Sequence, residues 1–216
     1  AAAATADDAL MLGPALLVHP VVRAGVASEQ VYLPAGVWYD IDTLAPVAGA
    51  RTLDVATPLS KVPAFYRGGH VVPLRTRARR SSTQQARDPF TLVVAPDADG
   101  DAAGALYIDD GVSFDYERAN QGKGAFDLVR FRLTRDAASG ARTLTGTVEA
   151  RTFPTPVGIE RIVVLGVPDA PRTVSVAVAG AKQPVPVEFV HNATAQTLTL
   201  KKPVASVLSD WVITIA

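Results

Sequence analysis

Short apolar runs broken by glycine and proline constrain what this chain can fold into. The sequence has 16 glycines and 16 prolines in 216 residues, and no apolar pattern of helical period continues beyond about two turns. The runs are instead rich in β-branched and aromatic residues, as strands are. They cover residues 10–12, 15–18, 30–33, 37–39, 51–55, 64–66, 90–94, 105–108, 126–133, 144–149, 160–165, 174–178, 197–200 and 211–215. Many short strands separated by turn residues predict an all-β chain built of antiparallel β-sandwiches.

A polar segment divides these strands into two groups. Residues 75–89 contain a cluster of arginines followed by serine, threonine and glutamine, with no apolar period. This composition predicts a linker or a long surface loop. We therefore expect two domains, a smaller sandwich over residues 1–87 and a larger one over residues 88–216. Residues 77–80 would be sensitive to proteases if the loop is exposed.

Two adjacent glycines follow the strand expected at residues 64–66. Gly68 and Gly69 can adopt the positive φ angles that a tight turn requires. The sequence therefore predicts a β-hairpin over residues 65–72.

The charge balance and the lack of cysteine exclude several classes of site. Lys plus Arg number 21 and Asp plus Glu number 21, so the net charge is zero and gives no support to a nucleic-acid partner. The arginines of residues 75–80 have no aromatic residues between them, which favours a solvated loop over a binding patch. Without cysteine there is no disulfide, thiolate chemistry or Cys-ligated zinc. The glycine motifs of nucleotide sites are also missing.

The chain begins at Ala1, and its single methionine is Met11. The apolar stretch over residues 9–22 is shorter than the roughly twenty residues of a membrane helix, and no basic segment precedes it. We expect a core strand here and no membrane partner. A core strand so near the start leads us to expect processing or truncation upstream.

Two carboxylate clusters could carry chemistry. Residues 97–101 resemble the start of a calcium loop, but the glycine and glutamate that such a loop requires are replaced by Ala102 and Ile108. Asp109 and Asp110 are adjacent, so on a strand they would point to opposite faces rather than form a pair about 5 Å apart. Both clusters are expected to be turns.

The three histidines offer no recognisable site. His19, His70 and His191 are not separated by metal-ligand spacings. Spacing alone leaves a Ser-His-Asp triad open, but no Gly-x-Ser-x-Gly motif is present. Each histidine is expected to be a packed or surface residue, so the sequence predicts no catalytic, cofactor-binding or metal-binding residues.

Two tryptophans and one sequon are the remaining candidates. Trp38 and Trp211 lie in predicted strands, where a core position is favoured over an exposed sugar-binding platform. Asn192 begins the sequon Asn-Ala-Thr, the only one in the chain. A glycan on Asn192 and an unmodified turn remain equal alternatives.

Several longer motifs resemble the C-terminal region of family-31 glycoside hydrolases, in an order and spacing that fit most of the chain. A proline at position 14 departs from the acidic or polar residue usual in the first motif. Further motifs resemble the branch of the family that processes N-glycans. The motifs that resemble the family's C-terminal region are residues 13–21, 31–34, 37–40, 62–73 and 106–116. The motifs that resemble the N-glycan-processing branch are residues 79–82, 88–92, 159–164 and 209–213.

The resemblance implies an architecture. Family members have a catalytic (β/α)₈ barrel followed by proximal and distal C-terminal β-sandwiches. Residues 1–87 would hold the end of the barrel and the proximal sandwich, and residues 88–216 the distal one. The family's catalytic aspartates lie in barrel motifs such as Trp-x-Asp-Met-x-Glu, which this chain lacks. Asp109 and Asp110 match a distal-domain motif, so this chain alone is expected to be inactive.

The resemblance also implies an activity for the whole enzyme. It would be an exo-acting, retaining α-glucosidase that trims α-1,3-linked glucose from N-glycans in the endoplasmic reticulum during glycoprotein quality control. The implied partners are the catalytic barrel, which binds the N-glycan, and a β subunit that provides retention in that compartment. No cofactor is implied. The sandwiches would brace the barrel, and residues 9–22 are the expected contact.

Two other functions stay open at this stage. A free-standing carbohydrate-binding module would require exposed aromatic residues and no catalysis. An adhesion sandwich of the immunoglobulin type is weakened by the lack of cysteines. An exposed apolar patch at residues 9–22 would favour the enzyme fragment, and an exposed planar aromatic cluster would favour the module.

Overall fold

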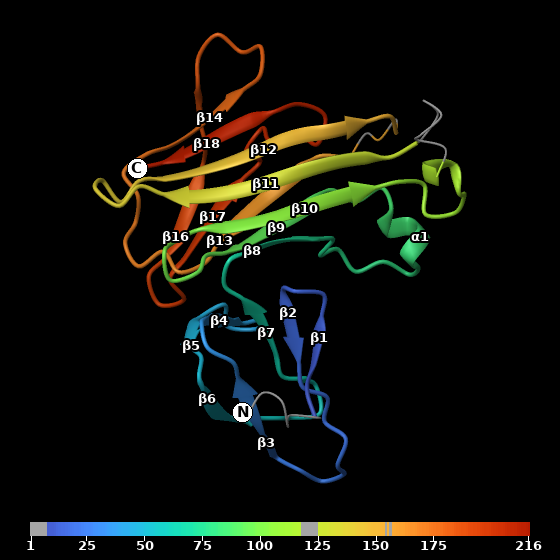
Figure 1. Ribbon diagram of the computed structural model, residues 1–216, viewed down its shortest axis with the longest axis vertical. Helices are drawn as coiled ribbons and strands as arrows, with labels where there is room; N and C mark the ends of the chain where they lie inside the picture. Colours follow the sequence, from blue (N-terminus) through green and yellow to red (C-terminus); the bar gives the residue numbers. More distant parts are fainter. Residues whose placement is uncertain (1–7, 118–124, 154, 156) are drawn as a thin grey trace.

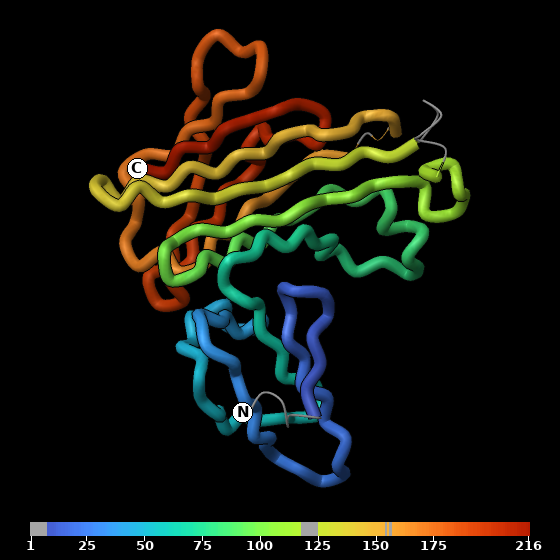
Figure 2. Tube along the Cα trace, viewed as in Figure 1, coloured from blue at the N-terminus to red at the C-terminus, as the bar shows by residue number. Residues whose placement is uncertain are grey.

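The computed structural model describes residues 8–117, 125–153, 155 and 157–216. Within these ranges the chain is almost entirely strand and forms a small lower and a large upper β-sandwich (Figures 1 and 2). The predicted all-β fold is confirmed, and every predicted strand segment overlaps an observed strand. Among the described residues, no helix has the length and apolar character needed to cross a membrane.

The small sandwich consists of a five-stranded antiparallel sheet packed on a two-stranded one. The two-stranded sheet alternates buried and exposed positions along its first strand, as expected when only one face is covered. In spatial order the first sheet is β1 (Leu10–Leu12), β2 (Leu16–Val18), β7 (Ala64–Arg67), β4 (Val37–Asp40) and β5 (Pro46–Ala48), and the second is β3 (Ser28–Leu33) with β6 (Arg51–Ala56). Their shared core is Leu17, Val31, Leu33, Trp38 and Phe65.

The large sandwich is one eleven-stranded sheet that folds over its own core. Its order is β15-β14-β18-β12-β11-β10-β8-β9-β13-β17-β16, and both halves contribute to the same apolar cluster. A short helix α1 (Ser82–Gln85) lies at one end (Figure 1). The strands are β8 (His70–Leu74), β9 (Phe90–Ala95), β10 (Ala102–Ile108), β11 (Asp127–Arg135), β12 (Arg142–Arg151), β13 (Ile159–Val164), β14 (Val174–Val178), β15 (Val185–Pro186), β16 (Phe189–Asn192), β17 (Thr197–Lys201) and β18 (Trp211–Ile215).

Two pairs of adjacent strands in this sheet are parallel, although antiparallel pairing was expected throughout. β13 runs parallel to β9, and β10 pairs with β8 through Ala103 and His70. The close approach of β10 to β8 requires a glycine, because a Cβ atom on Gly104 would lie 2.1 Å from the carbonyl oxygen of Val71.

The chain crosses from the small sandwich to the large one at Gly68 and Gly69. The amide of Gly68 donates to the carbonyl oxygen of Val37 in β4, and the amide of Gly69 donates to that of Ala95 in β9, both at 2.8 Å. β7 and β8 therefore join different sheets, and the predicted hairpin over residues 65–72 is wrong. The two glycines do turn the chain, but each amide finds its partner on a separate sheet.

β8 belongs to the large sheet although it precedes the polar segment 75–89. It pairs antiparallel with β9 along its whole length and parallel with β10. The sheets are thus divided at residues 68–69, ahead of the polar segment. The division into domains at residues 87 and 88 stays a prediction about which parts fold as units.

An apolar cluster fills the junction between the two sandwiches. Tyr39 and Tyr66 from the small sandwich pack with Val93, Val163 and Leu165 from the large one. The Tyr39 hydroxyl also crosses the junction and donates to a backbone carbonyl oxygen just after β9 at 2.9 Å. Burial raises the pKa of Tyr39 to about 12. The junction is therefore packed like a protein core.

Replacing Gly68 by alanine should loosen the crossing. A methyl group there would lie 2.8 Å from the backbone carbonyl oxygens of Val37 and Pro96, which cannot rotate away. We expect Gly68→Ala to lower the free energy of unfolding by about 2–3 kcal/mol in a urea titration. Gly158→Ala is the control, because no atom lies within 4 Å of the added carbon. Equal losses in both variants would contradict this account.

Removing the Tyr39 hydroxyl should have opposite effects at neutral and alkaline pH. Tyr39→Phe loses the hydrogen bond to Pro96, which should cost about 1 kcal/mol at pH 7. Between pH 10.0 and about 12 the tyrosine ionises only when unfolded, so unfolding releases a proton and the wild type loses stability as pH rises. Across this window the loss is about 3 kcal/mol. Plots of the unfolding free energy against pH, measured by denaturant titration, should therefore cross for the two proteins. A difference in unfolding free energy that stays constant with pH would refute the assignment.

Candidate functional site

The acidic cluster at residues 97–101 is a hydrogen-bonded turn. One carboxylate oxygen of Asp97 accepts from the amides of Asp99 and Asp101, each at 3.0 Å. Gly100 has a φ of +89° and donates to the Asp97 carbonyl oxygen at 3.1 Å. The carboxylate of Asp97 is thus occupied by its own turn, as the sequence interpretation expected.

The adjacent pair Asp109 and Asp110 forms the next turn in the same way. Asp109 accepts from the amide of Gly111 at 2.9 Å, and Asp110 accepts from those of Val112 and Ser113 at 3.0 and 2.9 Å. These backbone N–H groups lower the pKa of Asp110 below its ordinary value. Both carboxylates therefore stabilise loop structure after β10.

The three histidines lie apart in the fold. His19 is buried, with Nε2 3.8 Å from a carboxylate oxygen of the buried Glu29. His70 Nδ1 is 3.2 Å from one backbone carbonyl oxygen, and His191 Nε2 is 2.8 Å from another. Across the described ranges, no group of three or more His, Asp or Glu side chains is arranged to hold a metal ion.

Both tryptophans are core residues, as expected. Trp38 and Trp211 are each 1% exposed, and each indole N–H donates to a nearby backbone carbonyl oxygen. Trp211 occupies space left by Gly146, where a Cβ atom would lie 2.3 Å from the indole ring. Neither tryptophan provides a sugar-binding surface.

The sequon begins at the last residue of β16 and continues into the turn before β17. Asn192 is exposed, and its side-chain oxygen accepts from the amide of Ala195 at 3.1 Å. The asparagine is thus accessible at the surface, and its glycosylation stays a prediction.

The polar segment 75–89 is a surface loop, and two of its arginines, Arg77 and Arg79, are ion-paired. Nε and Nη2 of Arg79 donate to the two carboxylate oxygens of Asp88 at 2.9 and 2.6 Å. This bidentate contact, with the charges of neighbouring arginines, holds the pKa of Asp88 below its ordinary value. Arg77 pairs with Glu160 of β13, 83 positions along the chain. Sequence spacing gave no sign of either pair.

A cavity of about 800 Å³ lies between α1, the start of β9 and the end of β10. Tyr107 on its wall is 47% exposed and stacks on Phe126, with ring centroids 5.4 Å apart and planes at 22°. Asp109, Asp110 and Arg75 also line it. Burial and hydrogen bonding to Asp109 raise the pKa of Tyr107. Sequence patterns did not reveal this site, because the stacked ring belongs to Phe126, which directly precedes β11, rather than to the motif that contains Tyr107.

The strand β1 is apolar and exposed on both faces, so the core strand expected in residues 9–22 is realised only at β2, where Leu17 is buried. Leu10, Met11 and Leu12 are 44%, 42% and 56% exposed, although alternate side chains of a strand point in opposite directions. β1 is also an edge of its sheet, with β2 as its neighbour (Figure 1). An apolar edge of this kind is a surface that proteins normally cover.

Comparison with known proteins identifies the class to which these features belong. Residues 1–72 match the family model of the glycosyl hydrolase family 31 C-terminal domain. The chain has the sequence and fold of the C-terminal region of family-31 glycoside hydrolases, as its motifs predicted, and the described residues contain none of the helix-strand repeats of a catalytic barrel.

Within that family, the chain is similar to neutral alpha-glucosidase AB and to glucosidase II. It is 39% identical over 208 residues to neutral alpha-glucosidase AB of Sus scrofa, covering 95% of this chain and 21% of that protein. A probable glucan 1,3-alpha-glucosidase of Oryza sativa subsp. japonica is 33% identical over 213 residues, covering 97% and 23%.

A solved structure shows the same likeness in three dimensions. It is a heterodimeric complex of endoplasmic-reticulum glucosidase II, with a catalytic subunit and the binding domain of a regulatory subunit. The match has a TM-score of 0.80 and 32% identity, covering 97% of this chain and 23% of that one. The chain thus spans about a fifth of the length of the curated relatives it matches.

Proposed function

We propose that this chain is the C-terminal structural portion of an exo-acting, retaining α-glucosidase of the glucosidase II type. The whole enzyme would trim α-1,3-linked glucose from N-glycans in the lumen of the endoplasmic reticulum, during quality control of glycoprotein folding. The similarity to neutral alpha-glucosidase AB over 95% of the chain supports this proposal. The similarity to a probable glucan 1,3-alpha-glucosidase is consistent with the linkage.

The role proposed for this portion is to brace the catalytic barrel. The exposed β1 carries the proposal: three consecutive apolar side chains at a sheet edge would be covered by the barrel. Val22, at the end of the segment 9–22, is also 79% exposed. Burying this surface would contribute about 25 cal/mol for each Å² of apolar area removed from water.

We infer that the barrel of the same polypeptide is one partner and a β subunit another. The regulatory subunit in the related heterodimeric complex supports the second inference. Because catalysis would reside in the barrel, this chain alone is expected to be inactive. The exposed Asn192 is compatible with a luminal location, where glycans are added.

The Tyr107–Phe126 stack favours a second candidate function, carbohydrate binding without catalysis. The exposed aromatic ring is suited to stacking on a sugar ring. The carboxylates beside it are suited to accepting hydrogen bonds from the sugar's hydroxyl groups. A carbohydrate-binding module without catalysis would use this cavity. A glycan-binding screen on the 216-residue chain separates the two: tight binding lost in Tyr107→Ala would favour the module.

Polar substitutions in β1 should weaken the whole enzyme but leave the chain by itself unchanged. In the full-length enzyme, Leu10→Ser with Leu12→Ser should destabilise the enzyme by about 2–4 kcal/mol and shorten the lifetime of its activity on heating. In the 216-residue chain, where both side chains are exposed, unfolding should shift by less than about 0.5 kcal/mol.

The control for this pair is Val190→Ser with Val212→Ser, two other exposed apolar positions, on β16 and β18. It should change neither protein by more than about 0.5 kcal/mol. Equal stability of the full-length β1 variant and its control would refute β1 as the contact with the barrel.

Asparagine at position 110 should leave catalysis intact. We expect the full-length Asp110→Asn enzyme to hydrolyse an α-1,3-linked glucose disaccharide with kcat within about twofold of wild type, because this carboxylate accepts hydrogen bonds from its own loop. The change should instead lower the thermal stability. A loss of kcat beyond about a hundredfold in a folded enzyme, as removal of a catalytic group produces, would overturn the structural assignment.

A further inference from the structure

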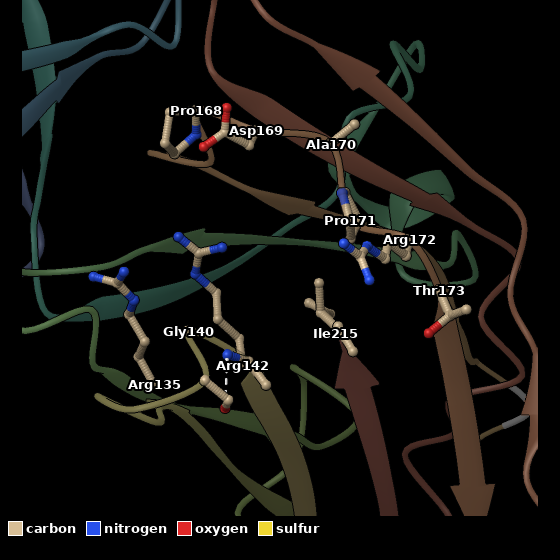
Figure 3. Close-up of a pocket in the computed structure, with 13 residues that line it drawn as sticks. Arg135, Gly140, Arg142, Pro168, Asp169, Ala170, Pro171, Arg172, Thr173 and Ile215 are labelled. Carbon is tan, nitrogen blue, oxygen red and sulfur yellow. Dashed lines mark hydrogen bonds between the residues drawn. The ribbon is translucent and has the colours of Figure 1, made fainter.

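A second cavity, of about 690 Å³, lies at the end of the large sandwich where β11 turns into β12. The loop before β14 and the end of β18 complete its wall (Figure 3). Its charged side chains are those of three arginines and one aspartate, Arg135, Arg142, Arg172 and Asp169, and Ala216 at the end of the 216-residue chain also lines it. Figure 3 shows Arg135 and Arg142 extending in the same direction, with Arg172 on the other side of the space.

Arg142 is the innermost of these arginines. It is half-buried, and its Nη2 donates to the carbonyl oxygen of Gly166 at 3.4 Å. Its Nε is buried and has no hydrogen-bond acceptor among the described residues. Burial, followed by the positive charge of Arg135, lowers the pKa of Arg142. The guanidinium is therefore both poorly solvated and next to a like charge.

The three arginines outnumber Asp169, the carboxylate side chain that lines the cavity with them. No ion pair among the described residues includes Arg135, Arg142 or Arg172. The arginines of the 75–89 loop differ, since Arg77 and Arg79 both pair with carboxylates. A guanidinium prefers a planar or tetrahedral oxyanion, to which it can donate two parallel hydrogen bonds.

We propose that this cavity binds a phosphate or sulfate group carried by a small molecule. Arg142, the least exposed of the three, would donate from the part of its guanidinium that lines the cavity, and Arg135 and Arg172 would approach the anion from the rim. The cavity volume lies in the range of small-molecule sites, about 300–1,000 Å³, and exceeds what an inorganic anion fills. Asp169 would accept hydrogen bonds from hydroxyl groups on the rest of the ligand, which favours a sugar phosphate over a free ion.

The test is calorimetric titration of the 216-residue chain with inorganic phosphate and with glucose 6-phosphate, at constant ionic strength in chloride. We expect both to bind, and Arg142→Gln to weaken both at least tenfold. Arg132→Gln is the matched control: it removes the same charge from β11, but Arg132 does not line the cavity. The affinity of Arg132→Gln for both compounds should stay within twofold of wild type.

Each outcome decides the proposal. Tighter binding of glucose 6-phosphate would support a sugar phosphate, and equal binding would support the oxyanion alone. Absence of binding by either compound, or equal losses in Arg142→Gln and Arg132→Gln, would overturn the site. If Arg142→Gln fails to fold, Arg135→Gln replaces it, because that side chain is exposed and its removal should still weaken binding severalfold.

Discussion

The amides of Gly68 and Gly69 are hydrogen-bonded to different sheets, and the placement of both sandwiches depends on this pair of bonds. Because consecutive amides are hydrogen-bonded to β4 and to β9, the two strands are held at a fixed short separation, and the small sandwich cannot rotate freely against the large one. A side chain at position 68 would separate the two sheets. The tight crossing also brings Tyr39 close enough to bond to Pro96 on the far side. The packed junction is thus a consequence of backbone geometry at two glycines.

The strand that follows the crossing holds the large sheet together. β8 lies between β10 and β9 in the strand order, so it joins the two halves of the folded sheet. Gly104 allows β10 to approach β8, and the antiparallel pairing of β8 with β9 provides the other side. The segment leaving the small sandwich is therefore a structural part of the large one. This arrangement would transmit any load on the small sandwich directly into the centre of the large sheet.

Local patterns in the sequence predicted the strands but not their partners. Apolar β-branched runs located most strands. Two short strands outside these runs, β5 and β15, each contain a proline and lie at sheet edges, where proline is tolerated. The parallel pairs and the glycine crossing depend on contacts between distant segments, which periodicity does not encode. The Arg-lined and Tyr107-lined cavities were missed for the same reason. Turn chemistry, by contrast, is local, so the roles of Asp97 and Asp110 followed from their dipeptides and neighbours.

The position of β8 ahead of the polar loop changes what a cut in that loop would do. Residues 77–80 lie between β8 and β9, which are hydrogen-bonded along the whole of β8. Cleavage there would break the covalent chain, yet the N-terminal fragment would still supply β8 to a sheet whose remaining strands belong to the C-terminal fragment. The two pieces would form a strand-complemented complex, separable under denaturing conditions and migrating as one species under native conditions.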